Sequence, residues 1–234
     1  MNFNDIWIPD EWKGKIVVKD DLLPITHFEN IRQYVNDFSF PWNYHKNLTV
    51  EKLTETNSVE DYDYGFGTLI LNNVIPDETG EKQILRPDAV NNIQFTPLNQ
   101  NFISFMTPFL WSIQDYIGVD YILRSRFDMT LKTPYEEYIH QPHTDYHSEF
   151  PHISMIIYIN DSDGDTILFN ETSTGMSKEE YDKIEINDLT IRQRVEPKKG
   201  RVLIFDGSIL HTGCSPHKFK NRIILNSIFT NMPK

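Results

Sequence analysis

The stretch RSRFDMTLK, residues 124–132, decides the fold class of this 234-residue chain. Apolar and polar side chains alternate along it: the apolar ones are Phe127, Met129 and Leu131, and the polar ones are Arg126, Asp128, Thr130 and Lys132. A period of two is the pattern of a β-strand with one buried face. Similar short segments follow, separated by turn-rich sequences such as NDSDGD and PKKG, at residues 152–159, 165–169, 188–196, 201–205 and 222–229. We therefore expect a mainly β fold, a double-stranded β-helix of the jelly-roll or cupin-like kind, over residues 119–234.

Residues 1–118 have a different pattern and predict a helical and mixed region that supports the sheets. Thr26 and Glu29 have the spacing of a capping box, so we expect a helix over residues 27–38. A second helix is predicted from Pro97 to about residue 117, with a kink at Pro108. No linker divides the sequence, and we expect one domain, 1–234, with the helices against one outer face.

Composition excludes several classes of function. The formal net charge of −12, with no long cluster of Lys and Arg, argues against nucleic acid as a partner. The single cysteine, Cys214, excludes an internal disulfide and suits a reducing cytoplasm. The N-terminus lacks the pattern of a signal peptide, and no stretch reaches the roughly 20 apolar residues of a membrane span. A cytoplasmic protein without membrane contact is expected.

A histidine-rich stretch, HQPHTDYHSEFPH at residues 140–152, contains candidate metal ligands. On a strand, His143 and Asp145 point to the same side, and Asp145 and His147 have the same spacing. His147 and His152 are interpreted as structural or solvent-facing, and His140, at an odd offset from His143, is expected to face the other way. The best distal partner is His211, at the start of a new strand after the DGS turn. Two imidazoles and one carboxylate leave coordination positions open, as in non-haem Fe(II) oxygenases.

Arginines on the predicted strands are candidate anion ligands. Arg222 begins an apolar strand, where its planar fork suits a carboxylate such as the distal one of 2-oxoglutarate. The alternative is an ion pair with an acid at the rim of the barrel. Arg126 is the alternative candidate for binding the 2-oxoglutarate carboxylate. If its strand face lines the interior, Arg126 and Asp128 contact substrate, and if not, they form a solvated face.

In the order His143-Thr-Asp145, His211 and Arg222, the chain resembles the 2-oxoglutarate/Fe(II)-dependent oxygenase superfamily, nearest its prolyl-4-hydroxylase-like branch. Residues 120–230 are also similar to uncharacterised phage and marine bacterial members, so a phage-encoded chain would act in the host cytoplasm. The resemblance implies that His143, Asp145 and His211 hold Fe(II) and that Arg222 binds 2-oxoglutarate. Some relatives have a serine two positions after the arginine, where this chain has Ile224. Tyr158 is therefore our candidate for the second contact to 2-oxoglutarate.

The implied reaction takes 2-oxoglutarate and O2 as cosubstrates and hydroxylates an unidentified small-molecule or peptide substrate, with a peptidyl or free amino acid as one candidate. Asp145, in place of a small residue, favours hydroxylation over halogenation, and His147 is a candidate at the substrate mouth. Two alternatives stay open: a cupin-like metal-dependent isomerase or epimerase, and a non-catalytic jelly-roll protein with a binding or structural role. The acidic segment 171–188 is either a solvated insertion or a lid.

Overall fold

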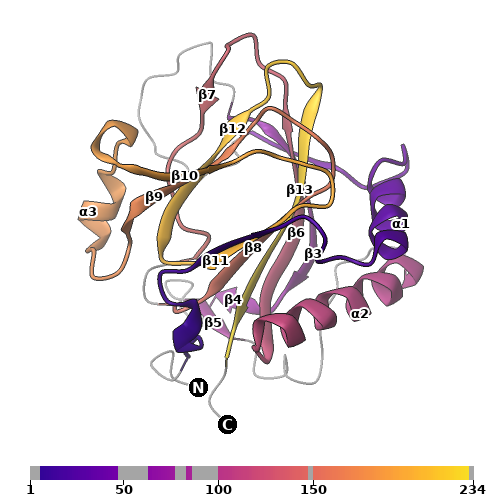
Figure 1. Cartoon of the computed structure of the whole chain (residues 1–234), viewed down its shortest axis with the longest axis horizontal. Coiled ribbons are helices and arrows are strands. Elements are labelled where there is room, and N and C mark those ends of the chain that lie inside the picture. Colours follow the sequence, from indigo (N-terminus) through magenta and orange to yellow (C-terminus); the bar gives the residue numbers. More distant parts are fainter. Residues whose placement is uncertain (1–5, 47–62, 77–82, 86–99, 147–149, 232–234) are drawn as a thin grey trace.

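Two antiparallel β-sheets lie face to face in the part of the chain that the structure describes (Figure 1). This computed structural model describes residues 6–46, 63–76, 83–85, 100–146 and 150–231. The strands of the larger sheet are, in spatial order, β1 (Ile16–Lys19), β11 (Val202–Asp206), β8 (Ile153–Tyr158), β13 (Asn221–Thr230), β6 (Tyr121–Leu131), β3 (Gly65–Asn72) and β2 (Asn43–His45). The strands of the smaller sheet are β10 (Ile191–Val195), β9 (Thr166–Thr172), β12 (Ile209–Ser215) and β7 (Tyr138–Ile139). The predicted jelly roll is confirmed.

The N-terminal half contributes strands as well as helices. Strands β1, β2 and β3 extend the larger sheet at its two edges, and β4 (Val74–Pro76) pairs with β5 (Gln83–Leu85) separately. The centre of the larger sheet is β13, which pairs with β8 on one side and β6 on the other. In one cross-strand row, Asn226 of β13 has Ile156 and Arg126 as its partners. This row crosses the face that looks toward the smaller sheet.

Two helices cover the outer face of the larger sheet (Figure 1). These are α1 (Ile25–Val35) and α2 (Gln100–Ile117), which continues through Pro108. Phe127 of β6 is fully buried beneath them, and the Tyr34 and Phe102 rings stack with centroids 4.1 Å apart. The apolar face predicted for residues 124–132 is therefore the face that packs on the helices. No helix in the described part of the chain combines the length and apolar character needed to cross a bilayer.

The prediction of a capping box at Thr26 was wrong. Helix α1 begins at Ile25, directly after Pro24, and has no side-chain cap. Because Thr26 already lies inside the first turn, its hydroxyl is not at the capping position. Glu29 instead pairs with Arg32 at 2.7 Å and with Lys199 at 3.0 Å. The helix also ends at Val35 rather than at 38, which leaves Phe38 fully exposed.

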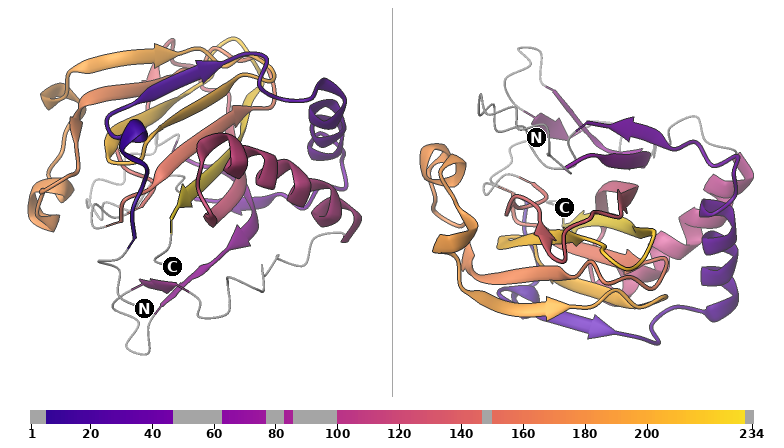
Figure 2. Two further views of the ribbon diagram at one scale, coloured as in Figure 1. Left: turned by 60° about the horizontal axis from the view of Figure 1, so that its bottom comes forward. Right: turned by 90° about the horizontal axis from the view of Figure 1, so that it is seen from above.

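The segment 171–188 packs on the outer face of the smaller sheet, on the opposite side of the molecule from α1 (Figure 2). It contains α3 (Lys178–Asp182), which has a true capping box formed by Ser177 and Glu180, and a 3-10 turn, η3 (Ile186–Asp188). A second 3-10 turn, η2 (Asp10–Trp12), lies near the N-terminus. Ile184 is buried against Ile167 and Phe169. Neither a purely solvated insertion nor a free lid describes a segment that is anchored in this way.

Candidate metal centre

Three side chains from distant parts of the sequence converge between the two sheets. The ligand atoms of His143, Asp145 and His211 all lie within 4.8 Å of one another. The backbones of His143 and His211 form an isolated antiparallel bridge with two mutual hydrogen bonds of 2.9 Å, and their ring centroids are 4.7 Å apart. His143 and Asp145 lie in an irregular segment between β7 and β8, not on a regular strand as predicted. The single bridge to His211 holds the segment in place.

Both histidine rings present the same nitrogen to the centre. Nδ1 of His143 lies 2.9 Å from the carbonyl oxygen of Gln141, and Nδ1 of His211 lies 3.1 Å from that of Ile209. A carbonyl can only accept, so both Nδ1 atoms carry the proton and donate it. Nε2 of each neutral ring is then left as a lone-pair donor for a metal ion, as in many metal sites.

Burial keeps both rings neutral at physiological pH. Burial lowers the pKa of His143, and it lowers the pKa of His211 to about 4, against an ordinary value of 6.5. The nearby Asp145 carboxylate opposes this shift but does not overcome it. Neutral imidazole is the form that binds metals, so no proton has to leave before binding.

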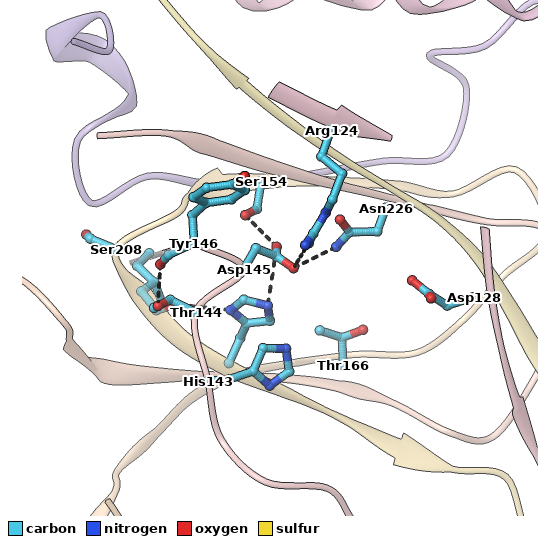
Figure 3. A network of polar contacts seen from close by, with 12 residues as sticks. Arg124, Asp128, His143, Thr144, Asp145, Tyr146, Ser154, Thr166, Ser208 and Asn226 are labelled. Carbon is cyan, nitrogen blue, oxygen red and sulfur yellow. Dashed lines mark hydrogen bonds and ion pairs between the residues drawn. The ribbon is translucent and has the colours of Figure 1, made fainter. Parts of the chain in front are cut away.

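Several donors fix the Asp145 carboxylate (Figure 3). Ser154 Oγ donates to Oδ2 at 2.7 Å, and Asn226 Nδ2 donates to Oδ1 at 3.0 Å. The Arg124 guanidinium lies 3.5 Å from Oδ1, and His211 Nε2 lies 3.6 Å from Oδ2. Burial raises the pKa of Asp145, but Coulombic attraction to His211, Arg124 and His143, of which the two histidine rings carry a charge only in acid, outweighs it together with the Ser154 hydrogen bond and holds this pKa well below its usual range. Asp145 is therefore an ionised, oriented carboxylate.

At the other end of the same pocket, Arg222 is a buried cation without a carboxylate partner among the described residues. Its Nη2 donates to Thr166 Oγ1 at 2.7 Å, and its Nε makes no hydrogen bond within the part of the chain that is described. A Cβ at Gly213 would lie 3.3 Å from Nη1, so the glycine lets the guanidinium lie against the backbone. A buried unpaired guanidinium is costly unless an anion binds it.

Thr166, rather than Tyr158, has the hydroxyl that faces this pocket. Tyr158 is fully buried behind it and donates its hydroxyl proton to Thr166 Oγ1 at 2.6 Å. Burial also raises the pKa of Tyr158, so this hydroxyl stays protonated. Since Thr166 Oγ1 accepts from both Tyr158 and Arg222, its own hydrogen is free to donate into the pocket.

The pocket joins the two ends and encloses about 560 Å³, including the part open to solvent. Arg126 and Asp128 line it, so the polar face of β6 looks inward. His140 lies at its wall, but its ring nitrogens contact Asp63 at 2.7 Å and Ser215 at 2.9 Å, which leaves neither for a metal. His147, predicted at the substrate mouth, lies outside the described residues.

Sequence reasoning missed four residues of the site: Arg124, Ser154, Thr166 and Asn226. Asn226 and Ser154 are polar residues inside the apolar stretches RIILNSIF and HISMIIYI, and this interruption was the available signal. Arg124 shares the inward face of its strand with Arg126, two residues away. Nothing local distinguishes Thr166 from an ordinary strand threonine.

The segment 171–188 also supports the ligand-bearing loop. The Tyr181 hydroxyl accepts a hydrogen bond from the backbone N–H of Thr144 at 2.8 Å. Gln141 Nε2 donates to the carbonyl oxygen of Ile184 at 3.0 Å. The residues beside His143 and Asp145 are thus tied to the outer layer of the smaller sheet.

Part of the chain is similar to a known protein family. Residues 133–230 match the model of the 2OG-Fe(II) oxygenase superfamily. Over these residues the chain is similar to that superfamily, whose members use Fe(II), 2-oxoglutarate and O2. The match favours the oxygenase interpretation over the isomerase and non-catalytic alternatives. No curated protein sequence matched the chain.

Solved structures share the fold at low sequence identity. A 2OG-Fe(II) oxygenase family oxidoreductase from Burkholderia pseudomallei is 13% identical with a TM-score of 0.54, over 92% of this chain and 84% of that one. SnoN, a non-heme alpha-ketoglutarate-dependent epimerase from nogalamycin biosynthesis, is 8% identical with a TM-score of 0.58, over 93% and 79% of the two chains. A Pseudomonas putida prolyl-4-hydroxylase is 11% identical with a TM-score of 0.46, over 94% of each chain.

Proposed function

We propose that His143, Asp145 and His211 bind Fe(II), and that the enzyme couples oxidative decarboxylation of 2-oxoglutarate to hydroxylation of a small substrate. The observation that supports this most is the donor set itself. Two neutral imidazoles offering Nε2 and one ionised carboxylate lie within 4.8 Å, beside a pocket that ends at an unpaired buried arginine. This set leaves coordination positions for other ligands.

Arg222 and Thr166 would hold the distal carboxylate of 2-oxoglutarate. The unpartnered Arg222 Nε and the free Thr166 hydrogen are the donors that such a carboxylate needs. Tyr158 then acts indirectly, since its hydroxyl fixes the direction of the Thr166 hydroxyl. Ile224, where some relatives have serine, adds an apolar wall in place of a donor.

When bound, iron and 2-oxoglutarate supply the oxidising chemistry, with succinate and CO2 as products. The protein's own residues orient the Asp145 carboxylate and exclude water. Ser154, Asn226 and Arg124 keep the Asp145 carboxylate in position. Ile156 and Ile224 line the pocket with apolar surface, which limits water around the reacting groups.

Succinate formation from 2-oxoglutarate tests the ligand assignment. We expect Asp145→Ala and His211→Ala to lower it at least about 1,000-fold and to remove stoichiometric Fe(II) binding, because two remaining ligands hold iron poorly. Asp115→Ala, at an exposed position of α2, is the matched control and should retain wild-type turnover. Thermal unfolding of each variant checks that the fold survives. Normal succinate formation by either ligand variant would refute the assignment.

A further inference from the structure

The inward face of β6 carries two charged side chains that the proposed chemistry does not use. Along this face, Arg124 is engaged with Asp145, whereas Arg126 and Asp128 line the pocket and contact none of the three metal-ligand candidates at hydrogen-bonding distance. Arg126 is cross-strand neighbour to Asn226, which donates to Asp145. Arg126 and Asp128 therefore lie beside the candidate metal centre, where a bound substrate can contact them.

Arg126 and Asp128 carry opposite charges and lie next to each other, but their hydrogen-bonding groups have few partners. Arg126 Nε lies 2.9 Å from Asp128 Oδ2, yet among the described residues this buried N–H makes no well-directed hydrogen bond. The side chains remain 33% and 13% exposed, so a ligand in the pocket can reach them. A partly buried ion pair adds little to stability, because desolvation offsets its attraction.

A glycine lets the second oxygen of Asp128 lie close to the backbone of β3. Gly67 of β3 is the cross-strand partner of Asp128, and a Cβ there would lie 3.3 Å from Oδ1 and 2.9 Å from His45 Nε2. Oδ2 faces Arg126, whereas Oδ1 lies close to the Gly67 backbone and the His45 ring and makes no hydrogen bond within the described residues. An acceptor for a cationic group is thus available next to a donor for an anionic one.

We propose that the substrate is a free α-amino acid, whose carboxylate binds Arg126 and whose ammonium group binds Asp128. Its two charges are as close together as those of the protein pair, so both can be matched at once. A singly charged substrate would leave one partner unmatched, and a peptide residue has neither charge. This inference rests on the proposed function, which supplies 2-oxoglutarate and O2. One oxygen atom enters a C–H bond of the amino acid as hydroxyl, and the other enters succinate as CO2 leaves.

The test compares each standard L-amino acid with its N-acetyl and carboxamide forms. Wild-type protein is loaded anaerobically with Fe(II) and 2-oxoglutarate, and the shift of the visible charge-transfer band and of the thermal midpoint report binding. Aerobic succinate release reports turnover. We expect at least one free amino acid to shift both signals and to stimulate succinate release about 10-fold or more, and its two capped forms to bind about 10- to 100-fold more weakly.

Variants of Arg126 and Asp128 test which charged group of the substrate each side chain binds. Arg126→Gln should remove the preference for the free carboxylate over the carboxamide, and Asp128→Asn the preference for the free ammonium over the N-acetyl form, each by about 10- to 100-fold. Gly67→Ala should weaken amino-acid binding and leave the 2-oxoglutarate band unchanged. Arg192→Gln, at an exposed position of β10, is the matched control.

The outcomes separate the two proposals. A normal band with no response to any free amino acid, or with equal responses to free and capped forms, would overturn the substrate class and leave the proposed function intact. Unchanged selectivity in both Arg126→Gln and Asp128→Asn would do the same. Failure of Fe(II) and 2-oxoglutarate to give the band would overturn the proposed function and this inference with it.

Discussion

The two ends of the pocket differ in how completely the protein satisfies their charges. At the metal end, both oxygens of Asp145 have partners, and both histidine Nδ1 atoms donate to backbone carbonyls. At the other end, Arg222 donates to the neutral Thr166, has no carboxylate within ion-pair distance among the described residues, and its Nε makes no hydrogen bond there. The first end holds three ligands in place before any metal binds. The second leaves a positive charge that no carboxylate among the described residues neutralises.

Under the proposed function, this difference gives each of the two ligands, the metal and 2-oxoglutarate, its own end of the pocket. A preorganised ligand set costs little to complete, because its rings and carboxylate are already oriented. A buried guanidinium without a counter-charge is unfavourable alone and gains most when an anion enters. The arrangement is typical of a site whose cosubstrate bridges the metal and the arginine.

Replacing Arg222 should give the largest difference between the two ends of the pocket. We expect Arg222→Gln to raise the KM for 2-oxoglutarate about 1,000-fold, because a buried charge-assisted contact is lost, while Fe(II) affinity stays the same. Arg222→Lys should restore only part of the loss, since it keeps the charge without the planar fork. Steady-state succinate assays and metal titrations measure both quantities. An unchanged KM in Arg222→Gln would assign the distal carboxylate to another group.

The metal end should also determine the acid stability of the metal-free protein. The pKa of His211 is lowered to about 4 by burial, so between about pH 6.5 and 4 the unfolded chain binds a proton that the folded chain does not. The free energy of unfolding therefore falls as pH falls through this window, by on the order of 3 kcal/mol at its lower end. Burial lowers the pKa of His152 too, which acts in the same direction.

Urea unfolding of the metal-free protein from about pH 7 to 4.5 measures this loss. His211→Gln should flatten the pH dependence, and His45→Gln, at an exposed position of β2, should leave it unchanged. A wild-type stability that is constant over this range, or an equal slope in His211→Gln, would show that the buried ring is not the group that titrates.

The partners of Asp145 give the smallest expected effect. Asn226→Ala and Ser154→Ala each remove one hydrogen bond to the carboxylate and should weaken Fe(II) or Mn(II) binding about 10-fold, with little change in the KM for 2-oxoglutarate. Anaerobic metal titration detects the change. Ser112→Ala, on α2, serves as the control for the loss of a hydroxyl. If the KM rises instead, the two ends are coupled and the comparison fails.

The sequence allowed much of this site to be predicted, because its signals are local. The period-two pattern of residues 124–132 identified a two-faced strand, and the order His143, Asp145, His211 contains ligand types that few other sites need. Tyr158 was predicted to contact 2-oxoglutarate, but Thr166 lines the pocket in its place, and which of the two faces the pocket depends on how closely the two sheets approach. The pattern of residues along a strand contains no information about the distance between the two sheets.

Other features depended on contacts that cross the fold. The helix α1 begins at Ile25 rather than after Thr26 because Pro24 ends the preceding extended segment there. The segment 171–188 looked solvated from its charges, yet its few apolar residues cover the smaller sheet and Tyr181 reaches the loop of Asp145. Such contacts join residues far apart in sequence, so no local pattern reveals them.

A crystal structure of the protein with Mn(II) and 2-oxoglutarate would test the central claim most directly. We expect one anomalous peak bonded to Nε2 of His143, Nε2 of His211 and a carboxylate oxygen of Asp145, with 2-oxoglutarate chelating the metal and its distal carboxylate on Arg222. Metal bound elsewhere, or a 2-oxoglutarate whose distal carboxylate turns away from Arg222, would contradict the account.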